Sequence, residues 1–228
     1  MIVHDCAQGS SEWWDLRLGI PTVSQLSKII TPKALKYSAG AKSFTATLIA
    51  ERALGRPLDW GQSMDTIWTE RGTSMEDEAR TFYEFYRDCD VVVPGFCTLD
   101  GGGFGGSPDG LVGDFGGVEI KCRAAQAHQE CLNGTAEIAD RLQVQGYLWL
   151  TGRSWWDVLA YNDAPELRNK IQRVYPDGAV HTAIEEGLDR FMSEMTEVEA
   201  RLAEYGPVIE EDDQLLHELR ESVKAGAS

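Results

Sequence analysis

The chain has 228 residues, of which 43% are hydrophobic, and it carries a formal net charge of −16. This apolar content is sufficient for a sizeable core, so the composition excludes an intrinsically disordered chain. No apolar run approaches the roughly 18 residues that a membrane-spanning helix needs, and residues 1–8 lack the basic and apolar regions of a signal peptide. We therefore expect a cytoplasmic protein without a membrane segment, folded as a single domain over residues 1–228.

The charge and the cysteines limit the kinds of site that the chain can contain. A strongly acidic balance argues against a generic nucleic-acid-binding protein, because such proteins usually present a basic surface. It does not exclude a metal-dependent nuclease, since divalent cations need carboxylate ligands. The five cysteines form no C-x-x-C pair and the four histidines are scattered, so neither a disulfide framework nor a zinc ribbon is predicted.

The first third of the chain has a mainly helical pattern. Capping residues, helical spacing of apolar residues and Gly or Pro stops predict four helices there, over about residues 11–18, 22–30, 42–54 and 69–87. The third of these is expected to end at Gly55, just before Pro57.

From residue 91 the pattern changes to short β-branched or aromatic runs separated by Gly-rich turns, which predicts strands. The predicted strands cover residues 91–93, 96–99, 104–112 and 117–122, with a hairpin turn at 114–117. Further along, we expect helices at 123–132 and 136–151, strands at 155–161 and 171–175, a helix at 179–205 and a polar helical tail. This order predicts an α/β fold with a central mixed β-sheet flanked by α-helices.

Residues 107–122 contain the pattern that is most informative about chemistry. In a strand, Glu119 and Lys121 point to one face while their apolar neighbours point to the other. If the two flanking runs pair as a hairpin, Asp109 comes close to both. Two carboxylates can hold Mg²⁺, and an ammonium can orient water or balance the charge of a phosphodiester transition state. Taken alone, however, a D-x₉-E-x-K spacing favours a surface hairpin with a salt bridge.

Two further features widen this pattern. Glu76 lies beside the apolar stripe of the predicted helix 69–87, and Gln143 and Tyr147 share one helical face. Together with residues 107–122, they resemble the PD-(D/E)XK nuclease superfamily and, more narrowly, the lambda exonuclease family of YqaJ-type viral recombinases. The resemblance is dense in four blocks that follow the family's order and spacing, namely residues 14–24, 71–85, 107–122 and 143–151. It is weak over residues 28–68 and beyond about residue 162.

The resemblance implies a PD-(D/E)XK restriction-endonuclease-like core and a role for each matching residue. Asp109 would be the ligand shared by the metal ions. Glu119 and the backbone carbonyl of Ile120 would complete the first metal site, and Lys121 would be the catalytic lysine. Glu76 would lie beside the second metal ion or the attacking water.

The resemblance also implies how a DNA end is bound. Gln143 would support the reacting groups, while Arg17, Ser24 and Ser107 match the positions that bind a 5′-phosphate. A guanidinium fork with two hydroxyls suits a terminal phosphate dianion. The resulting pocket would select phosphorylated 5′ ends.

The implied activity is Mg²⁺-dependent, processive 5′→3′ degradation of one strand of linear double-stranded DNA to mononucleotides. Two metal ions per site are implied, with Mn²⁺ as a possible substitute. The remaining 3′ strand would serve phage-type recombination by strand annealing in a bacterial host. A toroidal homotrimer and a single-strand annealing protein are the implied assembly and partner.

Several other interpretations of the sequence are open or disfavoured. Residues 101–106 match G-x-G-x-x-G, but no helix is predicted after them, so a dehydrogenase is disfavoured. The tryptophan pairs at 13–14 and 155–156 could stack on single-stranded DNA, although one member of each pair is expected in the core. A non-processive endonuclease would share the same catalytic residues, whereas a Cas4-type nuclease would need a cysteine cluster. A catalytically inactive DNA-end-binding module is the non-enzyme alternative, and it is disfavoured because every catalytic position holds a competent residue type.

Overall fold

The computed structural model describes residues 1–58, 66–133 and 137–205, with the backbone alone for 66–74 and 137–140. It comprises two compact units, residues 1–192 and 193–228, and the prediction of one domain over the whole chain stays a prediction. The predicted helical tail lies outside the described residues. Over the described ranges, none of the helices combines the length and apolarity that crossing a membrane requires.

The first unit is built on two β-sheets. A five-stranded sheet has the order β2-β5-β6-β7-β8, and a three-stranded sheet has the order β1-β3-β4. In the larger sheet β6 and β7 are parallel and the other neighbours antiparallel, so the predicted mixed sheet is confirmed. The strands are β1 (Ile2–His4), β2 (Val91–Val92), β3 (Phe96–Thr98), β4 (Gly105–Gly106), β5 (Gly110–Val112), β6 (Gly116–Cys122), β7 (Trp155–Tyr161) and β8 (Lys170–Val174).

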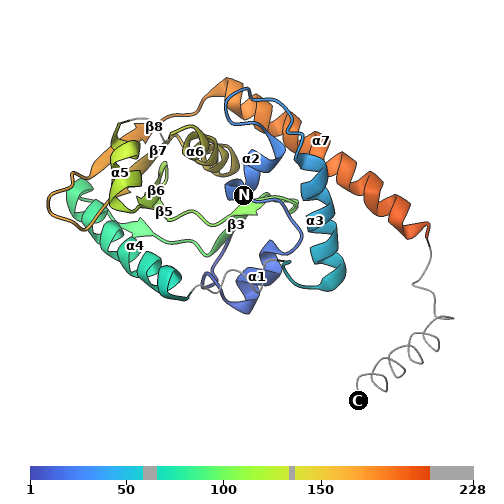
Figure 1. The fold of residues 1–228 in the computed structure, drawn as a ribbon, viewed down its shortest axis with the longest axis horizontal. Helices are drawn as coiled ribbons and strands as arrows, with labels where there is room; N and C mark the ends of the chain where they lie inside the picture. Colours follow the sequence, from blue (N-terminus) through green and yellow to red (C-terminus); the bar gives the residue numbers. More distant parts are fainter. Residues whose placement is uncertain (59–65, 134–136, 206–228) are drawn as a thin grey trace, which may run out of the picture. The chain divides into compact units, whose positions relative to one another are not determined.

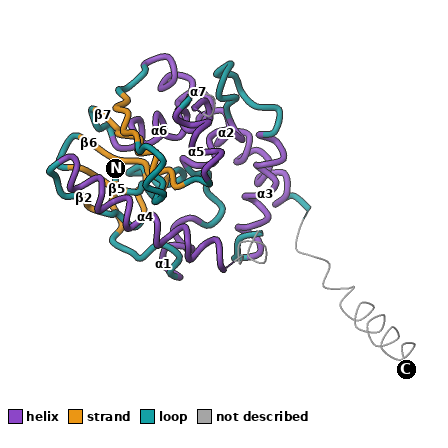
Figure 2. The backbone as a smooth tube through the Cα atoms, turned by 60° about the vertical axis from the view of Figure 1, so that its left-hand side comes forward, coloured by secondary structure: helices purple, strands orange, loops and turns teal. Residues whose placement is uncertain are grey.

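Helices cover both faces of the larger sheet (Figure 1). The helices are α1 (Ser11–Arg17), the 3₁₀ turn η1 (Val23–Gln25), α2 (Leu26–Ile29), α3 (Ala41–Leu54), α4 (Thr66–Arg87), α5 (Ala125–Leu132), α6 (Glu137–Thr151) and α7 (Gly178–Ala203). Figure 2 shows the strands of this sheet with α4 on one side and α5 and α6 on the other. All the predicted helices within the described residues are present, and α3 ends at Gly55 in the left-handed conformation that glycine favours.

The side-chain alternation of β6 explains this layering. Val118 and Ile120 pack against Ala79 of α4 in a buried apolar cluster. Glu119 and Lys121 point to the opposite face, where Lys121 contacts α6. An apolar back and a charged front therefore lie on the same central strand.

The structure corrects the predicted strand at 104–112. This stretch forms two strands in different sheets, since β4 pairs with β3 whereas β5 pairs with β6. Pro108 lies between them and has no N–H to donate to a strand ladder, so a continuous strand is disfavoured there. Strand β1 was not predicted, because three mostly exposed residues show no alternation.

A single arginine holds the turn of the β5–β6 hairpin. The Nη1 atom of Arg153 donates to the carbonyl oxygens of Gly113 at 2.7 Å and Gly116 at 2.6 Å. Because a hydrogen bond from a charged group contributes about 1.5–3 kcal/mol, we expect Arg153→Met to lower the free energy of unfolding by about 2 kcal/mol. Urea denaturation measures this change. The exposed Arg168 provides a control, and an equal effect of Arg168→Met would contradict the assignment.

Candidate active site

The β5–β6 hairpin brings Asp109 to the middle of β6. Gly110 pairs with Val118, so Asp109, one residue before β5, lies beside the next part of β6. Its Oδ2 atom accepts a hydrogen bond of 2.6 Å from the backbone N–H of Ile120. The predicted approach of Asp109 to the Glu119–Lys121 segment is thus confirmed, and it follows from the hairpin register.

Lys121 lies between two acceptors. Its Nζ atom is 2.8 Å from Oε1 of Glu119 and donates to Oε1 of Gln143 at 3.1 Å. Glu119 is 2% exposed, which means that the ion pair is largely removed from water. Gln143 comes from α6, and the contact therefore joins the helix to the charged face of β6.

The pKa of Asp109 is raised by its burial and by the carboxylate next to it. Burial and the neighbouring Glu119 carboxylate raise the pKa of Asp109 to about 8, although the Ile120 N–H and the Lys121 ammonium act in the opposite direction. One lysine therefore does not neutralise the two carboxylates fully. A cation bound at this place would offset the remaining repulsion.

Glu76 adds a third carboxylate to the same electrostatic field. Burial and the charge of Asp109 raise its pKa to about 7. Its Oε1 atom is paired with Arg80 at 3.2 Å, one helical turn further along α4. Glu76 is therefore close enough to be influenced by the charge of Asp109, and its role beside a metal ion or the attacking water stays a prediction.

These carboxylates alone do not make up a complete set of metal ligands. Among the residues that the structure describes, no group of three or more His, Cys, Asp or Glu side chains is arranged to hold a metal ion. Mg²⁺ is usually held by one or two carboxylates, with water and substrate phosphates completing its octahedron. Two carboxylates on one hairpin are therefore a donor set of the kind that Mg²⁺ uses.

The raised pKa values predict how stability depends on pH in the absence of divalent cations. Ordinary values of 3.8 for Asp109 and 4.5 for Glu76 rise to about 8 and about 7 in the fold. The folded protein therefore binds more protons between these limits, and the stabilisation present below about pH 4 is lost as the pH rises through 7 and 8. We expect the thermal midpoint in EDTA to fall over this range, and Asp109→Asn to flatten the slope. Addition of Mg²⁺ at pH 9 should raise the midpoint of the parent protein only; identical curves for both proteins would contradict this site.

Trp13 contacts two of the three predicted phosphate-binding residues, Arg17 and Ser107. The guanidinium of Arg17 lies 4.9 Å from the ring centroid of Trp13, and burial lowers the pKa of Arg17. Trp13 Nε1 in turn donates to the hydroxyl of Ser107 at 2.7 Å. Trp13 is 5% exposed, so it is the core member of its tryptophan pair, as Trp156 is of the other.

The two serines are engaged by the protein itself. The Ser107 hydroxyl donates to the carbonyl of Gly95 at 2.9 Å, so a phosphate would have to displace this bond. The Ser24 hydroxyl lies 3.2 Å from that of Thr22. In the described chain Ser24 makes no hydrogen bond with Arg17 or Ser107, and its role stays a prediction.

Two residues close to the candidate site were not among the predicted site residues. Tyr147 is buried, donates to the carbonyl of Ser107 at 2.8 Å, and has a pKa raised by burial and by the Glu119 and Asp109 charges. Its spacing from Gln143 was visible in the sequence, but that spacing alone indicates only a shared helix face. Arg80 pairs with Glu76, and the i,i+4 spacing of the two residues was the available signal.

Comparison with solved structures identifies exonucleases of similar fold. The crystal structure of LHK-Exo in complex with dAMP is 29% identical with a TM-score of 0.74, over 86% of this chain and 97% of its own. The alkaline exonuclease LHK-Exo from Laribacter hongkongensis is 27% identical with a TM-score of 0.68, over 86% and 100%. A phage related exonuclease from Haemophilus somnus 129PT, with 17% identity, a TM-score of 0.64 and coverage of 80% and 96%, supports the fold alone. The predicted fold class is confirmed.

The sequence comparison agrees with the structural one. No curated protein sequence matches the chain. The family model of the YqaJ-like viral recombinase domain matches residues 12–154, which is more than half of the chain and includes all the residues discussed for this site. The resemblance seen in the sequence is thereby confirmed, and the chain belongs to the family of YqaJ-like viral recombinase domains.

Proposed function

We propose that this protein is a metal-dependent exonuclease that degrades one strand of linear double-stranded DNA from 5′ to 3′ to mononucleotides. The observation that carries the proposal is that the β5–β6 hairpin brings Asp109, Glu119 and Lys121 together. Membership of the family and the likeness to solved exonucleases support the same reaction. The exposed 3′ strand would be the product used in recombination by strand annealing.

The residues of this candidate site fit Mg²⁺. Asp109 and Glu119 supply carboxylate oxygens, the Ile120 carbonyl supplies a third oxygen, and Glu76 lies in the same electrostatic field. Oxygen donors of this kind are the ones that hard cations prefer. When bound, one or two such cations supply charge neutralisation and polarisation of the scissile phosphate, and Mn²⁺ is expected to substitute.

The chain's own groups perform the remaining tasks. The Lys121 ammonium, held by Glu119 and Gln143, is positioned to stabilise negative charge that develops on the phosphate. Because Gln143 fixes this ammonium from α6, the helix and the hairpin set its position together. Burial of Glu119 keeps water from screening the interaction.

The direct test is digestion of a linear duplex labelled at either the 5′ or the 3′ end of one strand. In Mg²⁺ we expect the 5′ label to be released first as mononucleotide, while a closed circular duplex remains intact and EDTA stops the reaction. Nicking of the circle would assign the same residues to an endonuclease. Binding of DNA ends without cleavage in Mg²⁺ or Mn²⁺ would indicate an inactive end-binding module.

Arg17 is proposed to recognise the phosphate at the 5′ end. Loss of its planar fork in Arg17→Lys should reduce the preference for 5′-phosphorylated over 5′-hydroxyl ends by about tenfold, because a bidentate, charge-assisted contact is replaced by a point charge. The ratio of kcat/KM on the two substrates measures this preference. Arg168→Lys, at an exposed position, is the control and should leave the ratio unchanged. Equal kcat/KM of the parent protein on 5′-phosphorylated and 5′-hydroxyl ends would contradict the proposal that Arg17 recognises the phosphate.

We also propose that three copies form a ring around the DNA and that a single-strand annealing protein binds the strand that is left. Both proposals rest on the family resemblance. A closed ring gives processivity mechanically, since the substrate cannot leave sideways. Light scattering coupled to size exclusion should give three times the mass of the chain, whereas a monomer that is still processive would exclude the ring.

A further inference from the structure

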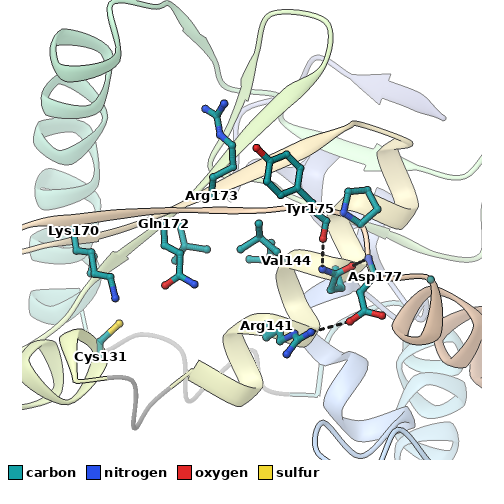
Figure 3. Close-up of a pocket in the computed structure, with 14 residues that line it drawn as sticks. Cys131, Arg141, Val144, Lys170, Gln172, Arg173, Tyr175 and Asp177 are labelled. Atoms are coloured by element: carbon teal, nitrogen blue, oxygen red, sulfur yellow. Dashed lines mark hydrogen bonds and ion pairs between the residues drawn. The ribbon is translucent and has the colours of Figure 1, made fainter.

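A half-open cavity of about 600 Å³ lies over β7 and β8. Its floor includes Val158 and Ala160, which pair with Glu119 and Lys121 in the parallel β6–β7 register, so the cavity and the candidate active site share one face of the sheet. Figure 3 shows that α6 borders the cavity with Arg141 and Val144. The residues proposed for catalysis do not line it.

The strand β8 gives this cavity a positive charge. Lys170 and Gln172 are two residues apart in β8, so their side chains lie on the same face of the sheet. Both extend toward α5 and α6 (Figure 3). Within the described ranges neither side chain has a hydrogen bond or an ion pair. Arg141 at the rim is paired with Asp177 at 2.8 Å, so among the side chains that the structure describes the Lys170 ammonium is a lining cation without an ion pair. The chain as a whole has a net charge of −16. Such a group attracts an anionic ligand.

Part of the cavity lining is apolar. Val144, Val158 and Val174 line it together with Ala160, so an aliphatic side chain could be buried beside the charged group. Strand β8 is also the last strand of its sheet, and no other described strand pairs with its outer edge. An open edge presents backbone N–H and C=O groups to which an extended peptide can add as a further strand.

We propose that this cavity and the open edge of β8 form a docking site for an extended acidic peptide segment of a partner protein. A carboxylate of the segment pairs with Lys170, a neighbouring aliphatic side chain enters among the valines, and the peptide backbone pairs with β8. The proposal is independent of the nuclease activity, because the residues proposed for catalysis do not line the cavity.

The structure favours a peptide over a nucleic acid at this place. A phosphate backbone binds through several cations at once, but of the basic residues at the cavity Arg173 is held by two hydrogen bonds of 2.9 Å to Asp157. Its guanidinium also lies 3.6 Å from the ring centroid of Trp155. Lys170 is then the main available cation, and one cation with an apolar floor and a strand edge matches an acidic peptide.

The test is a binding titration in which the full chain is added to a short labelled peptide and the fluorescence anisotropy of the peptide is measured. Thr occupies every second position of the peptide and Glu or Leu the positions between, so that Glu and Leu lie on one face of the extended peptide. We expect saturable binding that is about tenfold weaker in Lys170→Glu, since charge reversal turns attraction into repulsion. Lys33→Glu is the matched control, because Lys33 is also exposed and lies outside the cavity. An N-methylated version of the peptide keeps its charges but cannot pair with a strand, so it should also bind about tenfold more weakly.

Each result bears on the proposal. Binding that Lys170→Glu and N-methylation both weaken, with DNA digestion by Lys170→Glu at the parent rate, supports it. No binding by the parent protein, or equal binding by Lys170→Glu and the parent, overturns it. Displacement of the peptide by single-stranded DNA in a Lys170-dependent way would assign the cavity to nucleic acid instead.

Discussion

Asp109→Asn should slow DNA hydrolysis by at least about 1,000-fold, because loss of a carboxylate that holds the metal ion removes several kcal/mol of transition-state stabilisation. The substitution keeps the shape of the side chain, and the amide oxygen can still accept the hydrogen bond from Ile120. It also removes the repulsion with Glu119 that contributes to the raised pKa of Asp109. The variant should therefore fold at least as well as the parent protein. Single-turnover rates at saturating duplex DNA in Mg²⁺ measure the effect.

Asp114 offers a matched control for this change. It is an exposed carboxylate in the turn of the same hairpin, and Asp114→Asn should leave the rate within about twofold of the parent, as is usual for exposed positions. Full Mg²⁺-dependent activity of Asp109→Asn would place the catalytic centre elsewhere in the chain.

Lys121→Met should reduce the single-turnover rate by about 100- to 1,000-fold while DNA binding is retained. The loss is that of one preorganised positive group next to the developing charge, whereas binding of the duplex depends on contacts elsewhere along the DNA. Binding is measured by anisotropy of a labelled duplex in Ca²⁺. Because the substitution leaves Glu119 without the ammonium at 2.8 Å, urea denaturation must accompany the kinetics to show that the variant is folded.

Lys33→Met, at an exposed position far from β6 in the sequence, is the control for removal of a lysine. A Lys121→Met protein that binds DNA poorly but cleaves bound DNA at the parent rate would make Lys121 a binding residue. If Lys121→Met changed neither DNA binding nor the single-turnover rate, Lys121 would have no role in the site.

The arrangement of Asp109, Glu119 and Lys121 could largely be predicted because its geometry is local. Alternation along one strand puts Glu119 and Lys121 on the same face, and a short turn fixes the register that brings Asp109 to Ile120. Only the sequence between residues 107 and 122 is needed for this inference. The division between an apolar back and a charged front follows from the same alternation.

The parts that could not be predicted depend on distant partners. Gly105 pairs with Thr98 of β3, which splits the expected strand between two sheets, and no local pattern shows that pairing. The engagement of Ser107 by Trp13 joins residues 94 positions apart. The contact of Tyr147 with Ser107 likewise depends on tertiary packing. Helical spacing predicts which face of the helix Tyr147 lies on, but not which residues that face contacts.

The split of residues 105–112 between two sheets has a mechanical consequence. Ser107 is tied to Trp13 and Gly95 beside the smaller sheet, and Asp109 is tied to Ile120 in the larger one, with only Pro108 between them. Because proline fixes φ, this link has less conformational freedom than another residue would give it, and Ser107 and Asp109 are held close to each other along the backbone. Under the proposed function, the separation between a residue proposed to bind the 5′ end and a residue proposed to hold the metal ion is therefore built into the protein chain.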